Sequence, residues 1–483
     1  MRVTITGGGI AGLASALDLV RQGHQVTVVE RDDTPMPETA DEAFEWDRRG
    51  APQVRHSHAF LARLRNLLVA NHPDVLEALL AEGATEMRLG DTLPETMTTF
   101  EPEPGDDELV LIACRRTTFE WILRRAAMGE DGVTFRTGTA VTGLVADEQE
   151  NGIPVVTGVR LADESVIESD LVVVAAGRRS AAPEWLAEIG AQPVSETVED
   201  TGIIYTSRFY RLRPDAEAPP RTGPIGGDLG YIKYGTFPGD NRTFSVTLAA
   251  PSEDDQMRRL LADPEIFDAA ARSLPATAPW LDGRAEPLTE NVFLMAGLLN
   301  KWTEYVIDGE PVALGVIPVG DAVLCTNPLY GRGCSIAYWS ANLLTQAIAE
   351  HPNDVRAIAL SYDAALQTEI HPWYRASVEQ DREARRVAAA MLAGDDPDAD
   401  KSDPRTITRS IIREGLGSAL RTDPVVLRAF FKNLNLLTPP DALLADADFG
   451  ARVLAVLQDE DRPPMPYLGP KTRDEFLALL PTP

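Results

Sequence analysis

The first thirty residues contain two short apolar runs separated by one longer apolar segment. Residues 3–6 and 26–30 have the length and composition of buried strands, and the segment between them, which begins near Ile10, has those of a helix. A strand, a helix and a second strand in this order are typical of a βαβ unit in a parallel sheet. The sequence therefore predicts an α/β fold from its N-terminus onward.

The pattern changes twice along the rest of the chain. Strand-like runs separated by proline- and glycine-rich turns occupy the middle, together with two short helical stretches, and long amphipathic helical stretches follow Gly333. The expected strands are residues 203–212, 231–237, 243–249 and 291–306. The expected helices are residues 254–261, 264–273, 335–350, 355–390, 407–420 and 424–437. Residues 393–404, which are acidic and contain prolines, are the best candidate for a linker.

These changes of pattern predict three parts. Residues 1–200 and 285–350 form a discontinuous α/β domain, residues 201–284 form an inserted β-sheet domain, and residues 351–483 form a helical C-terminal region. The C-terminal helices could cover a pocket, form a homodimer contact or simply pack against the rest of the chain.

A glycine-rich loop follows the first predicted strand. Gly7, Gly9 and Gly12 have the spacing of the G-x-G-x-x-G motif, and the helix that includes Ile10 and Ala11 would direct free N–H groups at phosphates. The second strand ends in Glu30, followed by Arg31, at the distance where an acidic side chain binds a ribose. The loop predicts a dinucleotide site, but both FAD and NAD remain open.

A second glycine loop, about three hundred residues later, favours FAD. Residues 312–319 read as an apolar strand that ends in Gly320 and Asp321, and Gly331 and Gly333 open a long helix. A carboxylate at this place can bind the ribityl hydroxyls of a flavin, and the helix N-terminus favours the charge that gathers on reduction. Pro328 and Tyr330 are expected to line the isoalloxazine ring.

Seven motifs together resemble the FAD-dependent monooxygenase superfamily with the para-hydroxybenzoate hydroxylase fold. They are similar in order to the bacterial branch that contains polyether-pathway epoxidases and relatives of geranylgeranyl reductase. The motifs are residues 7–12, 30–31, 50–58, 116–120, 176–180, 300–302 and 320–333. The resemblance implies a Rossmann-like FAD-binding domain of the glutathione-reductase type, an inserted substrate-binding sheet over the flavin ring and a helical C-terminal region.

The resemblance also implies roles for single residues. Arg116 would lie against the flavin or its pyrophosphate, and Gly177 would belong to the segment that returns the chain to the cofactor. Direct NADPH users of the family often have Asp-Gly where this chain has Ala176-Gly177, which puts direct nicotinamide binding in doubt. The electron source is therefore NAD(P)H or a separate flavin reductase.

His56 and His58 are the candidate catalytic residues. They lie two residues apart in a polar segment and would project to the same side of an extended chain. An imidazole near the flavin could act as an acid or a base at neutral pH. The alternative is that one of them only anchors the loop. We expect no metal site, because the other histidines are scattered and no Cys/His spacing resembles a ligand set.

Charge and composition limit the partners. A formal net charge of −29 over 483 residues argues against nucleic-acid binding, and no apolar run is long enough to span a bilayer. The first strand begins at residue 2, which leaves no room for a secretory signal, and three cysteines fit a reducing compartment. We therefore expect a cytoplasmic enzyme without an integral membrane segment.

Four functions compete, and the motifs disfavour two of them. The resemblance favours a monooxygenase that hydroxylates or epoxidises a small apolar organic substrate with molecular oxygen through a flavin hydroperoxide. An FAD-dependent reductase or dehydrogenase acting on a carbon–carbon double bond would need the same two loops. A halogenase is disfavoured because the W-x-W-x-I-P motif is missing, and a non-catalytic FAD-fold protein is disfavoured by the intact Gly320-Asp321 loop.

Overall fold

The computed structural model describes residues 1–220 and 225–481. A five-stranded parallel sheet with the strand order β20-β9-β1-β2-β5 forms the centre of the N-terminal part. The strands are Val316–Pro318 (β20), Leu171–Val174 (β9), Arg2–Thr6 (β1), Gln25–Glu30 (β2) and Val133–Thr137 (β5). All residues of β9 are buried, as expected for a central parallel strand. The predicted α/β class is confirmed.

Three helices share an apolar core with the parallel sheet. α1 (Ile10–Arg21) connects β1 to β2, and it packs against α10 (Gly333–Glu350) and α5 (Arg116–Gly129). Every residue of α1 from Ile10 to Val20 is buried. Because β1 and β20 are strands of one parallel sheet, the loops that follow them leave the same edge of that sheet.

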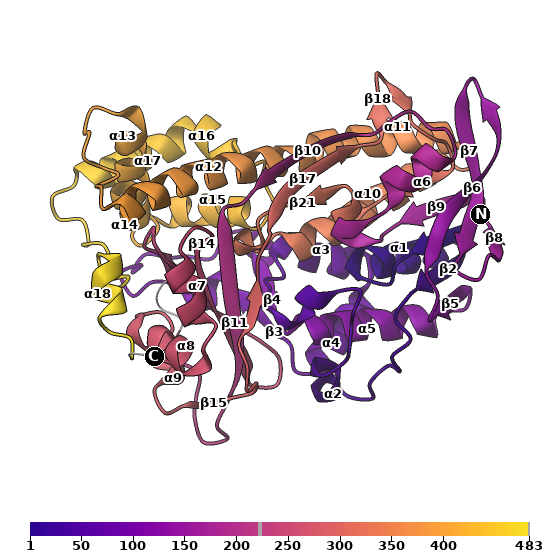
Figure 1. Cartoon of the computed structure of the whole chain (residues 1–483). Helices are drawn as coiled ribbons and strands as arrows, with labels where there is room; N and C mark the ends of the chain where they lie inside the picture. Colours follow the sequence, from indigo (N-terminus) through magenta and orange to yellow (C-terminus); the bar gives the residue numbers. More distant parts are fainter. Residues whose placement is uncertain (221–224, 482–483) are drawn as a thin grey trace.

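A second, antiparallel sheet lies beside the first (Figure 1). Its strand order is β12-β13-β14-β11-β15, and β16 also pairs with β11. The strands are Gly226–Asp228 (β12), Lys233–Pro238 (β13), Thr243–Pro251 (β14), Ile203–Leu212 (β11), Ala285–Pro287 (β15) and Phe293–Met295 (β16). The helices α7 (Asp255–Leu261), α8 (Pro264–Ser273) and α9 (Ala278–Leu281) share its apolar core. The sheet therefore continues past residue 284, and the division into three domains stays a prediction.

Two expected strands are shorter than the sequence pattern indicates. Residues 291–306 form β16 and β17 (Leu299–Glu304), which are separated by Gly297 with φ +63° and join different sheets. Within 312–319 only β20 belongs to the parallel sheet, because Gly315, with φ +74°, breaks the extended backbone. β17 pairs with β10 (Ser195–Asp200) and β21 (Leu324–Cys325) in a three-stranded sheet that runs between the two larger sheets.

The C-terminal region is helical, as expected. Residues 355–393 form one continuous helical segment made of α11 (Val355–Ala365), a π-helical turn (Leu366–Ile370) and α12 (His371–Ala393). Gly394, with φ +81°, ends it, and residues 395–403 contain no helix or strand. The later helices are α13 (Pro404–Ser410), a π-helical turn (Ile411–Leu416), α14 (Gly417–Ala419), α15 (Pro424–Leu434), α16 (Ala442–Ala445), α17 (Ala447–Gln458) and α18 (Arg473–Leu477).

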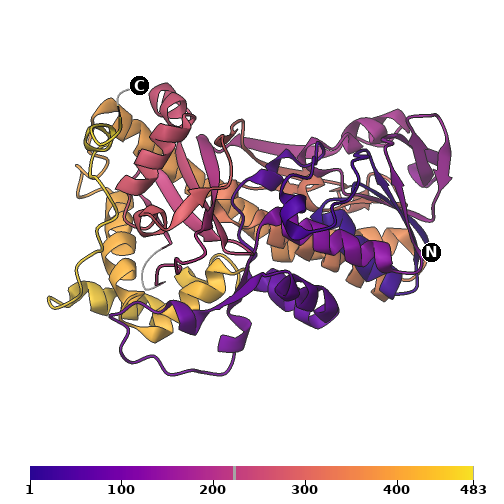
Figure 2. The same cartoon turned by 90° about the horizontal axis from the view of Figure 1, so that it is seen from below.

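The C-terminal helices contact distant parts of the chain. Leu427 of α15 packs with Leu89, Met97 and Leu109, and Figure 2 shows that purple segment beside the yellow helices. Phe476 of α18 is fully buried in the core of the antiparallel sheet. The C-terminal helices thus pack against residues 89–109 and against the antiparallel sheet.

The remaining elements lie around these layers. They are α2 (Ala40–Phe44), α3 (Ala62–Asn71), α4 (Pro73–Ala81), α6 (Ala182–Glu188), β3 (Thr85–Arg88), β4 (Val110–Ala113), β6 (Val141–Glu150), β7 (Ile153–Leu161), β8 (Val166–Glu168), β18 (Val306–Ile307) and β19 (Glu310–Pro311). Among the helices of the described residues, none has both the length and the apolar composition that a membrane span requires.

Candidate FAD site

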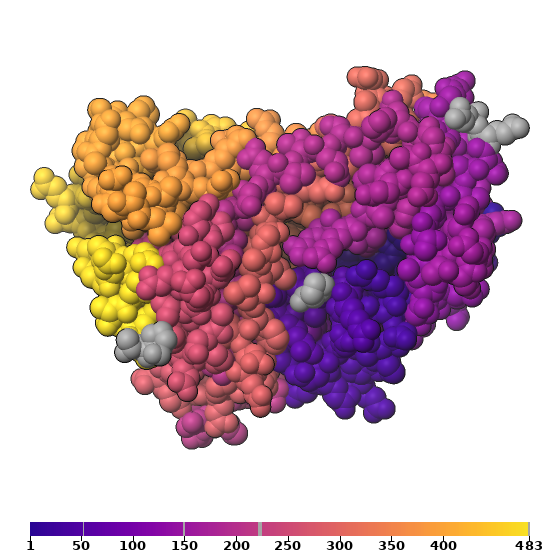
Figure 3. Space-filling view, in the orientation of Figure 1, coloured from indigo at the N-terminus to yellow at the C-terminus, as the bar shows by residue number. Residues whose placement is uncertain are grey.

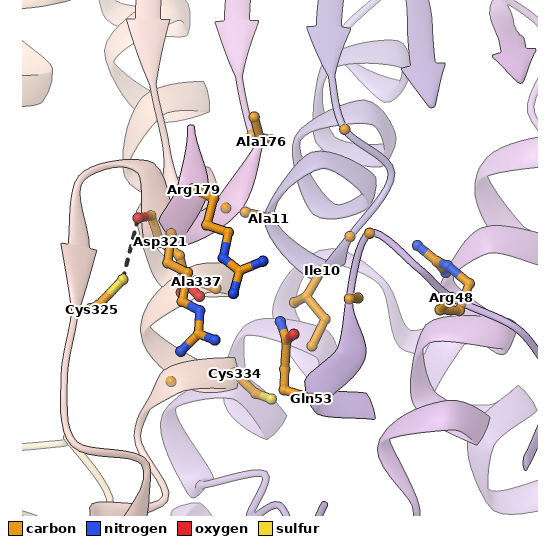
Figure 4. Close-up of a pocket in the computed structure, with 18 of the residues that line it drawn as sticks. Ile10, Ala11, Arg48, Gln53, Ala176, Arg179, Asp321, Cys325, Cys334 and Ala337 are labelled. Atoms are coloured by element: carbon orange, nitrogen blue, oxygen red, sulfur yellow. Dashed lines mark hydrogen bonds between the residues drawn. The ribbon is translucent and has the colours of Figure 1, made fainter. Parts of the chain in front are cut away.

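A cavity lies where the two glycine loops meet. Its volume is about 380 Å³, and its walls include Gly9, Ile10, Asp321 and Gly333 from these loops. In the space-filling view the surface is hollowed between the indigo N-terminal part and the magenta segments above it (Figure 3). In Figure 4, Asp321 and Arg179 lie on one side of this cavity, and Ile10 and Arg48 lie toward the other.

Each glycine of the first loop has a different surrounding. A Cβ atom on Gly7, whose φ is +106°, would lie 2.5 Å from the carbonyl oxygen of Ala175, and one on Gly12 would lie 2.0 Å from that of Gly7. A Cβ atom on Gly9 would have no atom within 4 Å, and Gly9 faces the cavity together with Ile10 and Ala11 of α1. Gly7 and Gly12 therefore allow the turn and the helix packing, and Gly9 leaves space for a ligand.

Glu30 is held by the backbone of the loop. It is 5% exposed, and its two carboxylate oxygens accept hydrogen bonds from the N–H groups of Gly8 (2.9 Å) and Asp32 (3.1 Å). Glu30 and the exposed Arg31 both line the cavity. The sequence placed these two residues correctly beside the first loop, and their contact with a cofactor stays a prediction.

Arg48 completes this part of the site and was missed from the sequence. Its buried guanidinium donates to the carbonyl oxygen of Gly8 at 3.0 Å and lies 3.2 Å from Glu120, 3.5 Å from Glu30 and 3.6 Å from Asp32. One cation thus lies among three carboxylates, two at the end of β2 and one on α5. No local motif marks this arginine, because the contacts depend on the tertiary fold.

The second loop presents an unpaired carboxylate to the cavity. Asp321 lies in a short 3₁₀ turn, Gly320–Ala322, and no hydrogen bond to its carboxylate is found among the described residues. Its backbone carbonyl accepts a hydrogen bond from the Cys325 thiol at 3.4 Å (Figure 4). Burial raises the pKa of Asp321, and the nearby Arg116 and Arg178 oppose this shift. A ligand with hydroxyl donors would satisfy this carboxylate.

The remaining predicted residues of the second loop differ in their position relative to the cavity. Pro328, Gly331 and Gly333 line the cavity, and Gly331 has the left-handed φ of +67° that suits glycine. A Cβ atom on Gly333, at the start of α10, would meet no atom within 4 Å. The expectation for Tyr330 was wrong, because its hydroxyl donates to Asp381 at 2.6 Å and the residue is not part of the cavity wall.

Arg116 and His58 form a connected pair on the cavity wall. The Arg116 guanidinium donates to Glu120 at 2.8 Å, and its second nitrogen lies 3.1 Å from Nε2 of His58. Nδ1 of His58 is 2.8 Å from the carbonyl oxygen of His56, so Nδ1 is the donor and Nε2 accepts from Arg116. Burial, with a further contribution from Arg116, holds the pKa of His58 well below its ordinary value. This imidazole is neutral at pH 7.

His56 lies behind the cavity wall. It is 4% exposed, its Nδ1 is 3.2 Å from the Ser207 hydroxyl, and its ring meets the ring of Tyr205 edge to face at 4.8 Å. It does not line the large cavity, whereas His58 does. The structure thus separates the two histidines that the sequence treated alike.

The buried state of His56 predicts a pH dependence of stability. Burial lowers the pKa of His56 from 6.5 to about 4. Between these values the unfolded chain binds a proton that the folded protein does not bind, so stability falls as the pH decreases through this window. We expect His56 to remove about 2 kcal/mol of the free energy of unfolding between pH 7 and pH 5. In urea unfolding, the decrease in the free energy of unfolding from pH 7 to pH 5 should be about 2 kcal/mol smaller in His56→Asn than in the wild type. Equal decreases in the two proteins would contradict the assignment.

Gly177 lies on the wall with two arginines that were not assigned a role. Gly177, with φ +74°, starts the 3₁₀ turn Gly177–Arg179 after β9. Arg178 and Arg179 also line the cavity, and among the described residues neither makes an ion pair or a side-chain hydrogen bond. Two adjacent basic residues after a glycine turn were the signal that could have identified them. Free guanidinium groups here fit a ligand that carries phosphate.

The described residues also limit other chemistry. Within residues 1–220 and 225–481, no group of three His, Cys, Asp or Glu side chains is arranged to hold a metal ion. Cys325 and Cys334 both lie on the cavity wall as free thiols, and burial raises the pKa of each. These thiols are therefore protonated at neutral pH.

Comparison with known proteins supports the flavin assignment. Residues 2–89 match the model of the family described as FAD dependent oxidoreductase. The chain is 27% identical over 468 residues to Protein Rv3254 of Mycobacterium tuberculosis, covering 90% of this chain and 89% of that protein. It is 24% identical over 375 residues to the kynurenine 3-monooxygenase of Salinispora arenicola, covering 75% of this chain and 76% of that enzyme.

A solved structure shows the same fold. PqsL of Pseudomonas aeruginosa, a probable FAD-dependent monooxygenase, superposes with a TM-score of 0.55 at 19% identity, covering 81% of this chain and 98% of PqsL. Both glycine loops, the free Asp321 carboxylate and the open space at Gly9 fit FAD as the cofactor. Residues 2–89 thus match the FAD dependent oxidoreductase family model, and the chain has the same fold as PqsL.

Proposed function

We propose that this protein is an FAD-dependent monooxygenase that hydroxylates or epoxidises a small apolar organic substrate with molecular oxygen. The observation that carries the proposal is the meeting of both glycine loops at one cavity that also has apolar residues in its lining. These residues include Tyr205, Met295, Leu298 and Pro328. An apolar lining excludes water and favours a substrate of the same character.

Different residues of the cavity would bind different parts of the cofactor. The N-terminus of α1 at Gly9 and Ile10 would bind the pyrophosphate, and Asp321 would accept hydrogen bonds from the ribityl chain. When bound, FAD supplies the redox chemistry of hydride acceptance and oxygen activation. The N-terminus of α10 at Gly333 would stabilise negative charge next to it.

We assign the two histidines different roles within this proposal. His58 lines the cavity and is neutral, with Nε2 fixed as an acceptor by Nδ1–H, so it can accept a hydrogen bond or hold a proton there only when Arg116 turns away. His56 would act through packing against Tyr205 and not through contact with the substrate. A loss of turnover in His58→Gln without the same loss in His56→Asn would support this division.

The visible spectrum of the purified protein tests the proposal first. We expect a flavin spectrum, and anaerobic addition of NADPH or NADH distinguishes direct reduction from supply by a partner reductase. After photochemical reduction, readmission of air should restore the oxidised spectrum within the mixing time. A reduced flavin that passes its electrons to the double bond of an added substrate without oxygen consumption would support the reductase alternative. A protein that binds no FAD would overturn both functions.

A further inference from the structure

One face of α12, from the C-terminal region, lies against the second glycine loop. Trp373, Ser377 and Asp381 are spaced four residues apart and therefore lie along one side of the helix. The Arg332 guanidinium lies 4.7 Å from the centre of the Trp373 ring, and one of its nitrogens donates to the Ser377 hydroxyl at 3.3 Å. The third position of this face, Asp381, makes the strongest polar contacts.

Asp381 joins the second loop to strand β17. The residue is 3% exposed, and its carboxylate accepts hydrogen bonds from the Asn300 side chain at 2.6 Å, from the Asn327 side chain at 2.7 Å and from the Tyr330 hydroxyl at 2.6 Å. A second contact closes the network, because the backbone N–H of Asn327 donates to the side-chain oxygen of Asn300 at 2.9 Å. Hydrogen bonds to a charged acceptor are stronger than those between neutral groups.

The residues that hydrogen-bond to Asp381 adjoin, in the chain, residues that line the cavity. Pro328 follows Asn327 and Gly331 follows Tyr330, and both line the cavity. Leu298 and Leu299, which precede Asn300, line it as well. We therefore expect a change in the contacts of Asp381 to shift the second loop relative to the start of β17.

We propose that Asp381 is a positioning residue that fixes the second glycine loop against β17 and so shapes the flavin end of the cavity. The C-terminal region is then part of the cofactor site, although none of the contacts of Asp381 reaches the cavity itself. The proposal rests on the assignment of FAD to this cavity.

Asp381→Asn tests the proposal with a side chain of the same shape. An amide has one acceptor oxygen, and its NH₂ group would face one of the three donors, so the network cannot be kept whole. We expect FAD to bind at least tenfold more weakly and the visible absorption bands of the bound flavin to shift. Both are measured by titrating the apoprotein with FAD, after circular dichroism has shown a native fold.

Two further variants separate positioning from folding. Tyr330→Phe removes one donor and leaves the carboxylate, so we expect an affinity loss of about threefold. Glu379→Gln makes the same change of acid to amide on the exposed side of α12 and should behave as the wild type. If Asp381→Asn does not fold, Tyr330→Phe decides, and an unchanged affinity and spectrum in that variant would overturn the proposal.

The outcomes also separate this proposal from the function itself. A wild-type protein that binds FAD, with an Asp381→Asn variant that binds it within twofold and with the same spectrum, would overturn the role of Asp381 alone. A wild-type protein that takes up no FAD would overturn the cofactor assignment and this proposal with it. Weaker binding in Asp381→Asn with wild-type behaviour in Glu379→Gln is the supporting result.

Discussion

Replacement of Asp321 by alanine should give a folded protein that purifies without FAD. The carboxylate faces the cavity without a hydrogen-bond partner among the described residues, so hydroxyl donors of the cofactor are its natural partners. A hydrogen bond to a charged group contributes about 1.5–3 kcal/mol, and the loss of two would weaken FAD binding by at least about 100-fold. Flavin absorbance per protein after gel filtration, followed by FAD titration, measures the effect.

The same substitution should not lower the free energy of unfolding of the apoprotein. Burial raises the pKa of Asp321, which means that the folded apoprotein disfavours its charge, so removal of the side chain costs little stability. Asp363→Ala is the matched control, because burial also raises the pKa of Asp363, to about 6, but the residue lies in α11 outside the cavity. Full flavin occupancy in Asp321→Ala would refute the assignment of the second loop.

The parts of the fold that the sequence predicts well depend on local periodicity. β1, α1 and β2 follow the expected ranges closely, because each buries a continuous apolar run and the glycines between them fit only one turn. The same holds for β11 and α8, whose observed bounds equal the expected ones. Here local preference and tertiary packing agree, so the pattern is sufficient.

The errors come from single backbone positions and from distant partners. Gly297 and Gly315 adopt positive φ values inside apolar runs and divide strands that the pattern joins. Tyr330 turns from the cavity to Asp381, a residue 51 positions later in the chain, and no property of the loop sequence encodes that partner. Arg48 was missed for the same reason, since its three carboxylates gather only in the folded chain.

The sequence motif does not distinguish the positions of the two histidines. His56 and His58 have the same side chain and lie in the same short segment, so the sequence makes them equivalent candidates. In the structure, however, His56 contacts the hydroxyl of Ser207 on β11. His58 instead reaches Arg116 at the start of α5. The elements packed on either side of the segment therefore decide which of the two imidazoles can contact a ligand. That packing cannot be predicted from the local sequence.

Alanine at Gly12 and at Gly9 should have opposite consequences, although both glycines belong to one motif. In Gly12→Ala the new Cβ would lie 2.0 Å from the carbonyl oxygen of Gly7, a backbone atom that can move only if α1 shifts from β1. We expect a loss of about 3 kcal/mol or more in the free energy of unfolding of the apoprotein, measured in urea.

Gly9→Ala should fold as well as the wild type and bind FAD poorly. Gly9 has φ −87°, which alanine adopts freely, and its Cβ would meet no protein atom within 4 Å. The methyl group would instead occupy the space next to the N-terminus of α1, where a pyrophosphate must approach the backbone closely. We expect an unfolding free energy within about 0.5 kcal/mol of the wild type and FAD binding weaker by at least tenfold. Wild-type FAD affinity in Gly9→Ala would mean that the first loop does not hold the cofactor, even if Gly12→Ala unfolds as expected.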